Sequence, residues 1–186
     1  MRYRNIIRYL PLIMLLLMSL KGCASQPRAH INPDYAFTDI SFYSLFPRHH
    51  QINDIQRLGD FQRNRIELAI EQTMDDLRFS YASEEQADVI VSYFLVQSSL
   101  KELNEYHRQV KACLVCTQNE LRTLNRKIGP DMLIIDLLST NNMRSIYRQV
   151  SSLKIKPKNT SDENQQLIVE AVQRGLADLA ILAKPL

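Results

Sequence analysis

The alternation of apolar and polar positions predicts several strands along the chain. Residues 35–46 (YAFTDISFYSLF) are aromatic and aliphatic and stop at Pro47, which is typical of one strand or of two short strands. Residues 87–97 (ADVIVSYFLVQ) are almost continuously apolar and rich in β-branched side chains, so we expect a central strand covered on both faces. Residues 132–138 (MLIIDLL) and 144–155 predict two more strands, paired as a hairpin through a polar turn.

Two other segments have the spacing of amphipathic helices. From Asp60, the expected N-cap, apolar side chains recur three and four residues apart as far as Leu77. The charged residues between them are expected on the solvated face: Arg63, Arg65, Glu67, Glu71, Asp75 and Asp76. Residues 160–163 (TSDE) match a capping box and predict a helix from about Ser161 to Ala183.

The order of these elements predicts one α+β domain over residues 34–186. We expect a mainly antiparallel sheet of about four strands with two helices packed on one face, in the order β-α-β-β-β-α. Residues 98–125 combine helical spacing with an interrupting pair of cysteines, and we treat them as an excursion between strands. A chain of this length is enough for one domain with a genuine core.

The first 22 residues have the pattern of an exported precursor. Three arginines precede a mostly apolar run from Leu10 to Leu20, which is typical of a secretory signal peptide. An uncleaved membrane anchor is the alternative. It fits less well, because a spanning helix takes about 20 apolar residues and Arg8 and Lys21 bracket a shorter run.

Residues 20–23 (LKGC) resemble the lipobox of bacterial lipoprotein precursors, with Lys21 where a small uncharged residue is usual. The resemblance implies that Cys23 is alkylated with a diacylglyceryl group, that the chain is cut before it, and that the new amino terminus is acylated, for instance with palmitate. Two or three acyl chains hold a protein on a membrane, whereas one binds weakly. Ala24 resembles lipoproteins that pass to the outer membrane. A disulfide or a free thiol at Cys23 is the alternative.

The charge of the chain changes once the signal peptide is removed. Residues 1–22 contain four basic and no acidic side chains, so the formal charge of +3 becomes −1, with 19 basic and 20 acidic residues. A nucleic-acid partner therefore has no support from net charge. Residues 23–33 are expected to form a short lipidated tether, which places the domain within roughly 35 Å of the bilayer.

Four stretches resemble one bacterial envelope lipoprotein family, known as domain of unknown function four-one-three-six (DUF4136). They are residues 34–46, the helix and strand from 65–71 to 87–93, the hairpin from Gly129 to Arg148, and the closing helix around 170–176. Tyr147 stands where the family has Trp. The resemblance covers about residues 33–185 and implies fold and location, without an activity.

Cys113 and Cys116 are the most chemically suggestive pair inside the domain. In an oxidising compartment we expect a local disulfide; a free or metal-bound pair and a thioredoxin-like redox site are the alternatives. A zinc site would need four ligands, and His107 with His49 or His50 would have to complete it. We therefore predict no metal and no other cofactor.

Asp136 is the one acid within an apolar strand, and its burial requires a partner. We expect a cross-strand pair with Arg148, or with Arg144 in another register. A catalytic acid is the functional alternative for Asp136, although no second acid or histidine lies near it in sequence.

The chain has four glycines and no phosphate loop, dinucleotide fingerprint or nucleophile elbow. These features predict a non-enzymatic lipoprotein, anchored in the outer membrane on its periplasmic face, that binds or supports another envelope component. A small-molecule or lipid carrier, and then a hydrolase, are the alternatives.

Overall fold

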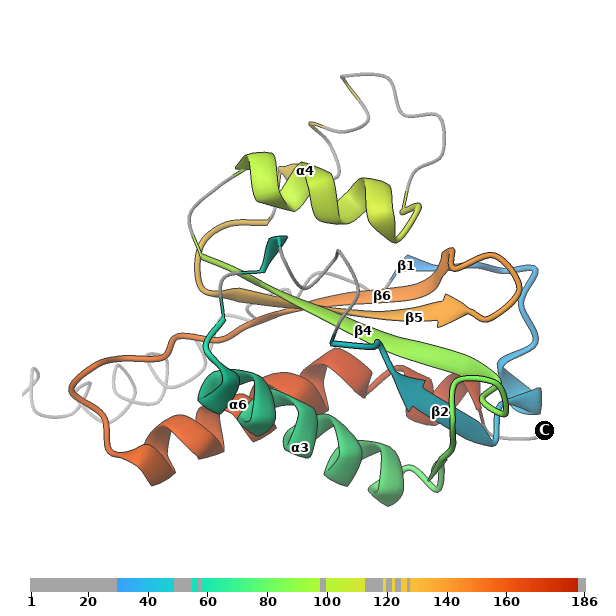
Figure 1. Cartoon of the computed structure of the whole chain (residues 1–186), viewed down its shortest axis with the longest axis horizontal. Helices are drawn as coiled ribbons and strands as arrows, with labels where there is room; N and C mark the ends of the chain where they lie inside the picture. Colours follow the sequence, from blue (N-terminus) through green and yellow to red (C-terminus); the bar gives the residue numbers. More distant parts are fainter. Residues whose placement is uncertain are drawn as a thin grey trace, which may run out of the picture.

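A six-stranded sheet forms the centre of the part of the chain that the structure describes (Figure 1). The computed structural model describes residues 30–48, 55, 56, 58–97, 100–112, 119, 122, 125, 126 and 128–183. The strands are β1 (His30–Ile31), β2 (Phe42–Leu45), β3 (Ser80–Tyr81), β4 (Val89–Val96), β5 (Met132–Ser139) and β6 (Ser145–Ser152). They lie in the order β1-β6-β5-β4-β2-β3.

Helices cover both faces of this sheet. Figure 1 shows α3 (Asp60–Asp76) and α6 (Ser161–Leu176) side by side on one face, and α4 (Leu100–Gln109) on the other. A 3₁₀ turn, η1 (Phe37–Asp39), precedes β2, and a short helix, α7 (Leu179–Leu182), follows α6. The α+β class is therefore confirmed, and the two predicted helices, α3 and α6, lie on one face as expected. The prediction is incomplete, because the sheet has six strands rather than about four and α4 covers its second face.

The sheet is mixed, with three antiparallel and two parallel strand pairings, so it is mainly but not wholly antiparallel. β2 runs parallel to β4, and α3 makes the connection between them, while β4, β5 and β6 form an antiparallel meander. All eight residues of β4 are buried, which agrees with the apolar run of the sequence. A strand that is buried on both faces needs cover on both, and α4 supplies the second layer.

α6 packs very closely on β5 through Gly175. A Cβ atom built on this glycine would lie 2.6 Å from Cδ1 of Ile135, so the absent side chain allows the close approach. The hydroxyl of Tyr147 donates to the Gly175 carbonyl at 2.9 Å. In a continuous helix that carbonyl would accept from Leu179, and α6 instead ends at Leu176. The prediction of one helix to Ala183 is wrong for this reason.

The beginnings of three elements also differ from the prediction. Residues 37–39 form the 3₁₀ turn, and β2 starts at Phe42, where the Asp88 carboxylate accepts the backbone N–H groups of Ser41 and Phe42, both at 2.8 Å. β1 lies in the stretch that the sequence assigned to the tether, and it pairs with β6. The N-cap of α3 is Gly59, with Asp60 as the first helical residue.

The solvated face of α3 is narrower than expected. Arg63 and Glu67 are both buried, with 8% of each exposed. Arg63 donates to the carbonyls of Leu58 and Gln56, and Glu67 accepts from the Tyr93 hydroxyl at 2.8 Å and pairs with Arg48. These contacts replace the hydrogen bonds to water that a buried charge loses.

Candidate functional site

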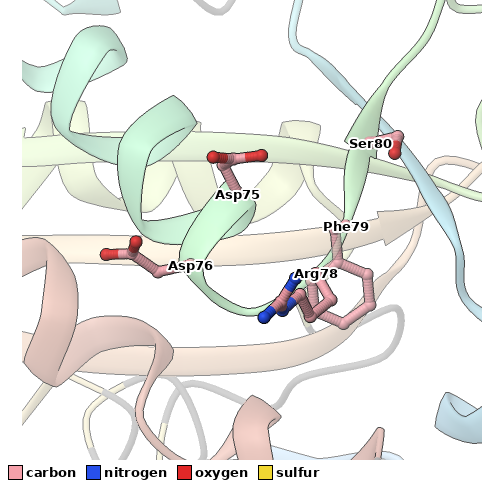
Figure 2. Close-up of a pocket in the computed structure, with 5 residues that line it drawn as sticks. All are labelled: Asp75, Asp76, Arg78, Phe79 and Ser80. Atoms are coloured by element: carbon pink, nitrogen blue, oxygen red, sulfur yellow. The ribbon is translucent and has the colours of Figure 1, made fainter.

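An acidic and aromatic surface lies where α3 ends and β3 begins. One depression of about 390 Å³ is lined by Asp75, Asp76, Arg78, Phe79 and Ser80 (Figure 2). A second, of about 460 Å³, is lined by Tyr43, Glu71, Asp75, Phe79, Ser80 and Tyr81. The two share three residues and form one continuous surface. We call these eight residues the α3–β3 surface.

The end of α3 is fixed by a Schellman motif that contains no glycine. The N–H of Arg78 donates to the Asp75 carbonyl at 2.8 Å, and the N–H of Phe79 donates to the Met74 carbonyl at 3.0 Å. Arg78 has a φ of 71°, a left-handed conformation that glycine usually supplies. Phe79 is buried in the core. The chain is thereby directed from the helix onto the edge of the sheet.

Asp75 and Asp76 present their carboxylates on different sides of the last helical turn (Figure 2). Asp75 lines both depressions, whereas Asp76 lines only the first of them. Glu71 lies one turn before Asp75 on α3 and lines the second depression. The second depression therefore contains two acidic side chains at i and i+4.

Tyr43 lines the second depression while being almost completely buried, with 2% of the residue exposed. Its ring meets the ring of Tyr81 edge to face, with centroids 5.7 Å apart. Burial, and then the charges of Glu71 and Asp75, raise the pKa of the Tyr43 hydroxyl to about 12. This hydroxyl is therefore protonated at neutral pH and lies within the field of the two carboxylates.

A second cluster, between α4 and the sheet, contains the buried pair expected from the sequence. Asp136 on β5 faces Arg148 on β6 in register. Nε of Arg148 donates to Oδ1 of Asp136 at 2.8 Å, and a terminal nitrogen donates to Oδ2 at 2.9 Å. Asp136 is fully buried, and 4% of Arg148 is exposed. The structure thus brings together these two residues rather than Asp136 and Arg144.

Side chains distant in the sequence complete the hydrogen bonding of this pair. Tyr106 of α4 donates to Asp136 Oδ2 at 2.6 Å, and Ser145 donates to Oδ1 at 2.6 Å. The ring of Tyr106 stacks on Phe94, with centroids 4.7 Å apart, and the Arg148 guanidinium lies 5.7 Å from the Tyr106 centroid. The carboxylate therefore accepts four hydrogen bonds and has no open face for a substrate. This geometry favours a structural role over a catalytic acid.

His107 extends the same cluster to the end of α4. A terminal nitrogen of Arg148 lies 2.7 Å from Nδ1 of His107, and Nε2 lies 2.8 Å from Oδ1 of Asn125. Arg148 can only donate, so Nδ1 is the acceptor and Nε2 carries the proton. Burial, and then the Arg148 charge, lower the pKa of His107 to about 4. The imidazole is neutral, and both of its nitrogens are engaged.

Several residues singled out in the sequence lie outside the described residues. These are the lipidation site Cys23, the histidines at 49 and 50, and the pair Cys113 and Cys116. The disulfide and its alternatives thus remain predictions. Within the described residues, no group of three or more His, Cys, Asp or Glu side chains is arranged to hold a metal ion.

Sequence reasoning did not identify the α3–β3 surface or the α4 side of the buried cluster. Glu71 and Asp75 were assigned to a solvated helix face, and Tyr43 to a strand. The spacing of Leu103, His107 and Val110 was the available signal for α4, and all three are buried. The cysteines at 113 and 116 follow this spacing closely and break its pattern, so the sequence alone does not predict the helix.

The order of the elements and the topology of the sheet define an α+β domain, with a mixed sheet and helices on both of its faces. The chain belongs to the family described as Domain of unknown function (DUF4136), which matches residues 28–179, so the family expected from the sequence is confirmed. A comparison with curated proteins finds no match. Within the described part of the chain, no helix has both the length and the apolar character to cross a membrane.

Among the solved structures similar to this chain are proteins of two kinds. One is a crystal structure of a DUF4136 family protein from Bacteroides thetaiotaomicron, with 13% identity, coverage of 84% of this chain and 96% of that chain, and a TM-score of 0.49. The others are PelC dodecamers from Paraburkholderia phytofirmans, with 10% and 11% identity and TM-scores of 0.40 and 0.42. Each covers 82% of this chain and 95% of the PelC chain.

Proposed function

We propose that this protein is a non-enzymatic lipoprotein of the outer membrane whose periplasmic domain binds another envelope protein through the α3–β3 surface. The observation that carries the proposal is the combination of aromatic and acidic side chains at an uncovered edge of the sheet. β3 is an edge strand of two exposed residues, and 61% of Tyr81 is exposed. Exposed tyrosines of this kind are enriched at the centres of protein interfaces.

The shape of the depressions favours a protein partner over a carried small molecule. A carrier needs a concave and mostly apolar pocket that covers most of its ligand. The α3–β3 depressions are open and are lined by Asp75 and other polar side chains. The cores on the two faces of the sheet are instead filled by large side chains such as Tyr106, Tyr147 and Met74.

The buried Asp136 cluster gives a hydrolase less support. A general acid or base must come within hydrogen-bond reach of the reacting group. Asp136 is fully buried, and its two oxygens already accept from Arg148, Tyr106 and Ser145. The cluster fastens α4 to the sheet, and we assign it to the fold.

Photocrosslinking in intact cells tests the proposal. A crosslinking amino acid is placed at Tyr81 of the full-length precursor, and separately at Lys158, an exposed position in the loop before α6. We expect both variant proteins in the outer-membrane fraction. Discrete crosslinked adducts should form from position 81 and none from position 158. Equal adducts from both positions, or none from position 81, would overturn the proposed surface.

A further inference from the structure

The second depression of the α3–β3 surface lacks a charge partner of its own. Glu71 and Asp75 are exposed, and within the described part of the chain neither forms an ion pair. Glu67, one turn before Glu71 on α3, is by contrast paired with Arg48. Two carboxylates four residues apart on one helix repel one another. A cation between them would remove this repulsion.

The hydroxyl of Tyr43 points to the same place. Only 2% of this residue is exposed, and because it lines the depression its hydroxyl stays accessible from that side. Within the described part of the chain, no side chain or backbone group is hydrogen-bonded to this hydroxyl. Tyr43 lines the depression together with both carboxylates, so its oxygen can accept from a donor that enters there.

The neighbouring rings favour an organic cation over a metal ion. The exposed Tyr81 ring stands edge to face with Tyr43 at the rim of the depression. Lysine and arginine head groups are attracted to aromatic faces, and they donate several hydrogen bonds to carboxylates. A hard metal ion would want six or more oxygen ligands, and three or more acidic or histidine ligands are not gathered among the described residues.

The adjacent backbone indicates that this cation belongs to a polypeptide. The N–H groups of Ser80 and Ala82 donate to carbonyls of residues 41 and 43. Because the backbone N–H and C=O groups of successive residues point to opposite sides of a strand, those of Tyr81 point away from β2, outward from the sheet edge. An extended segment could pair with Tyr81 while one of its side chains enters the depression, as in strand addition to a sheet edge.

We infer that the depression formed by Tyr43, Glu71, Asp75 and Tyr81 binds an arginine or lysine side chain of an extended segment of the partner protein. This inference rests on the proposed function and specifies the chemistry of its surface. The two carboxylates hold the cationic group, the Tyr43 hydroxyl accepts one of its N–H groups, and Tyr81 contacts its stem.

Binding of small probes to the full mature protein in detergent tests the inference. Acetyl-arginine amide is titrated while the tyrosine ring signals are followed by NMR, with acetyl-citrulline amide as the neutral counterpart. We expect the arginine probe to bind at least tenfold more tightly, the scale of one charge-assisted contact of about 1.4 kcal/mol. Equal affinity for the two probes, or no binding of the arginine probe, would overturn the inference.

Matched variants locate the contact. Glu71→Gln with Asp75→Asn should weaken arginine binding at least tenfold, and Tyr43→Phe about threefold or more, while Glu84→Gln should change it less than twofold. Glu84 is the control because it is an exposed acid shortly after β3 and lines neither depression. An equal effect of Glu84→Gln would mean that only net charge matters, which contradicts a defined site.

A second set of probes distinguishes the sources of the cation. A nine-residue strand-forming peptide with a central arginine should bind at least tenfold more tightly than acetyl-arginine amide. Spermidine that binds as tightly as the peptide would identify a free polyamine instead, and competition by millimolar Ca²⁺ would identify a metal site; both overturn the peptide assignment. If the Tyr81 crosslinks persist undiminished in the Glu71→Gln/Asp75→Asn variant, the proposed function stands and the cation site is wrong.

Discussion

The buried Asp136 and Arg148 show how single side chains determine the second core. Placing two charges in the interior is favourable only when hydrogen bonds satisfy both groups. Ser145 and Tyr106 donate the remaining hydrogen bonds to the Asp136 carboxylate, and His107 accepts one from the Arg148 guanidinium. Since two of these three partners belong to α4, the pair also determines where that helix lies.

His107 should make the stability of the domain depend on pH. Its pKa is about 4 in the folded protein, against about 6.5 in an unfolded chain. Between these values the unfolded chain binds more protons, so stability is fully present above pH 6.5 and falls as the pH drops toward 4. The loss attributable to His107 is about 3 kcal/mol. Urea unfolding at pH 7, 5.5 and 4.5 measures it.

A variant separates His107 from the other titrating groups. His107→Asn keeps an acceptor for Arg148 but does not titrate, so its unfolding free energy should start lower at pH 7 and decline less on acidification. His30→Asn, at an exposed position on β1, is the matched control and should decline like the unchanged protein. Identical slopes for all three proteins would show that His107 is not held neutral by the fold.

The sequence predicted the β5–β6 pair but not the residues around it. Asp136 and Arg148 stand on two strands joined by a short turn, so the periodicity brings them face to face. Tyr106 and His107 reach the pair only through the path of the chain after β4, which local spacing does not determine. Similarly, Glu71 looked like an ordinary solvated charge, because nothing in a helical pattern indicates that Tyr43 lies beside it.

The packing of α6 on the sheet is determined by a single missing side chain. Gly175→Ala would place a Cβ atom 2.6 Å from Cδ1 of Ile135, which is fully buried. Overpacking costs about 1–3 kcal/mol and exceeds the gain in helix propensity of about 1 kcal/mol. We expect a net loss of about 1 kcal/mol, and at most about 2 kcal/mol, in the free energy of unfolding, measured by urea denaturation.

A second substitution tests the contact itself. Ile135→Val removes the Cδ1 atom and should cost about 1 kcal/mol in the unchanged protein. In the Gly175→Ala background it should be neutral or stabilising, because it makes room for the new methyl group. Simple additivity of the two losses would contradict the assigned contact.

Apart from α4, the elements that the sequence missed are short. β1 and β3 have two residues each, too few to show an alternating pattern. The end of α3 was also not predictable, because the left-handed residue that ends it is Arg78, whereas a glycine usually occupies this position and marks the end of a helix in the sequence. β1 and β3 are the two edge strands of the sheet. Because β3 was not predicted, the α3–β3 surface could not be predicted either. The long periodic segments, α3, α6 and the β5–β6 hairpin, were recognised because burial repeats along them.

The layered architecture of the domain is explained by β4, an apolar strand that must be covered on both faces of the sheet. The sequence of β4 predicted burial on both faces, and this requirement already implied a layer beyond the one formed by α3 and α6. The expected α+β fold was therefore right in class and incomplete in layers. Since β1 starts at His30, a tether from a lipidated Cys23 would span at most about 25 Å, less than the roughly 35 Å expected from the sequence.

A tether of that length would make the lipid anchor decisive for where the α3–β3 surface can act. If Cys23 is lipidated, Cys23→Ala should move the protein from the membrane to the periplasmic fraction, because two or three acyl chains provide the attachment. Cys113→Ala is the matched control and should stay with the membrane. The intact mass of the mature protein should begin at an acylated Cys23, with Lys21→Ala giving the same mature mass. An unmodified Cys23, or retention of residues 1–22, would contradict the lipoprotein assignment while leaving the cation site open to its own test.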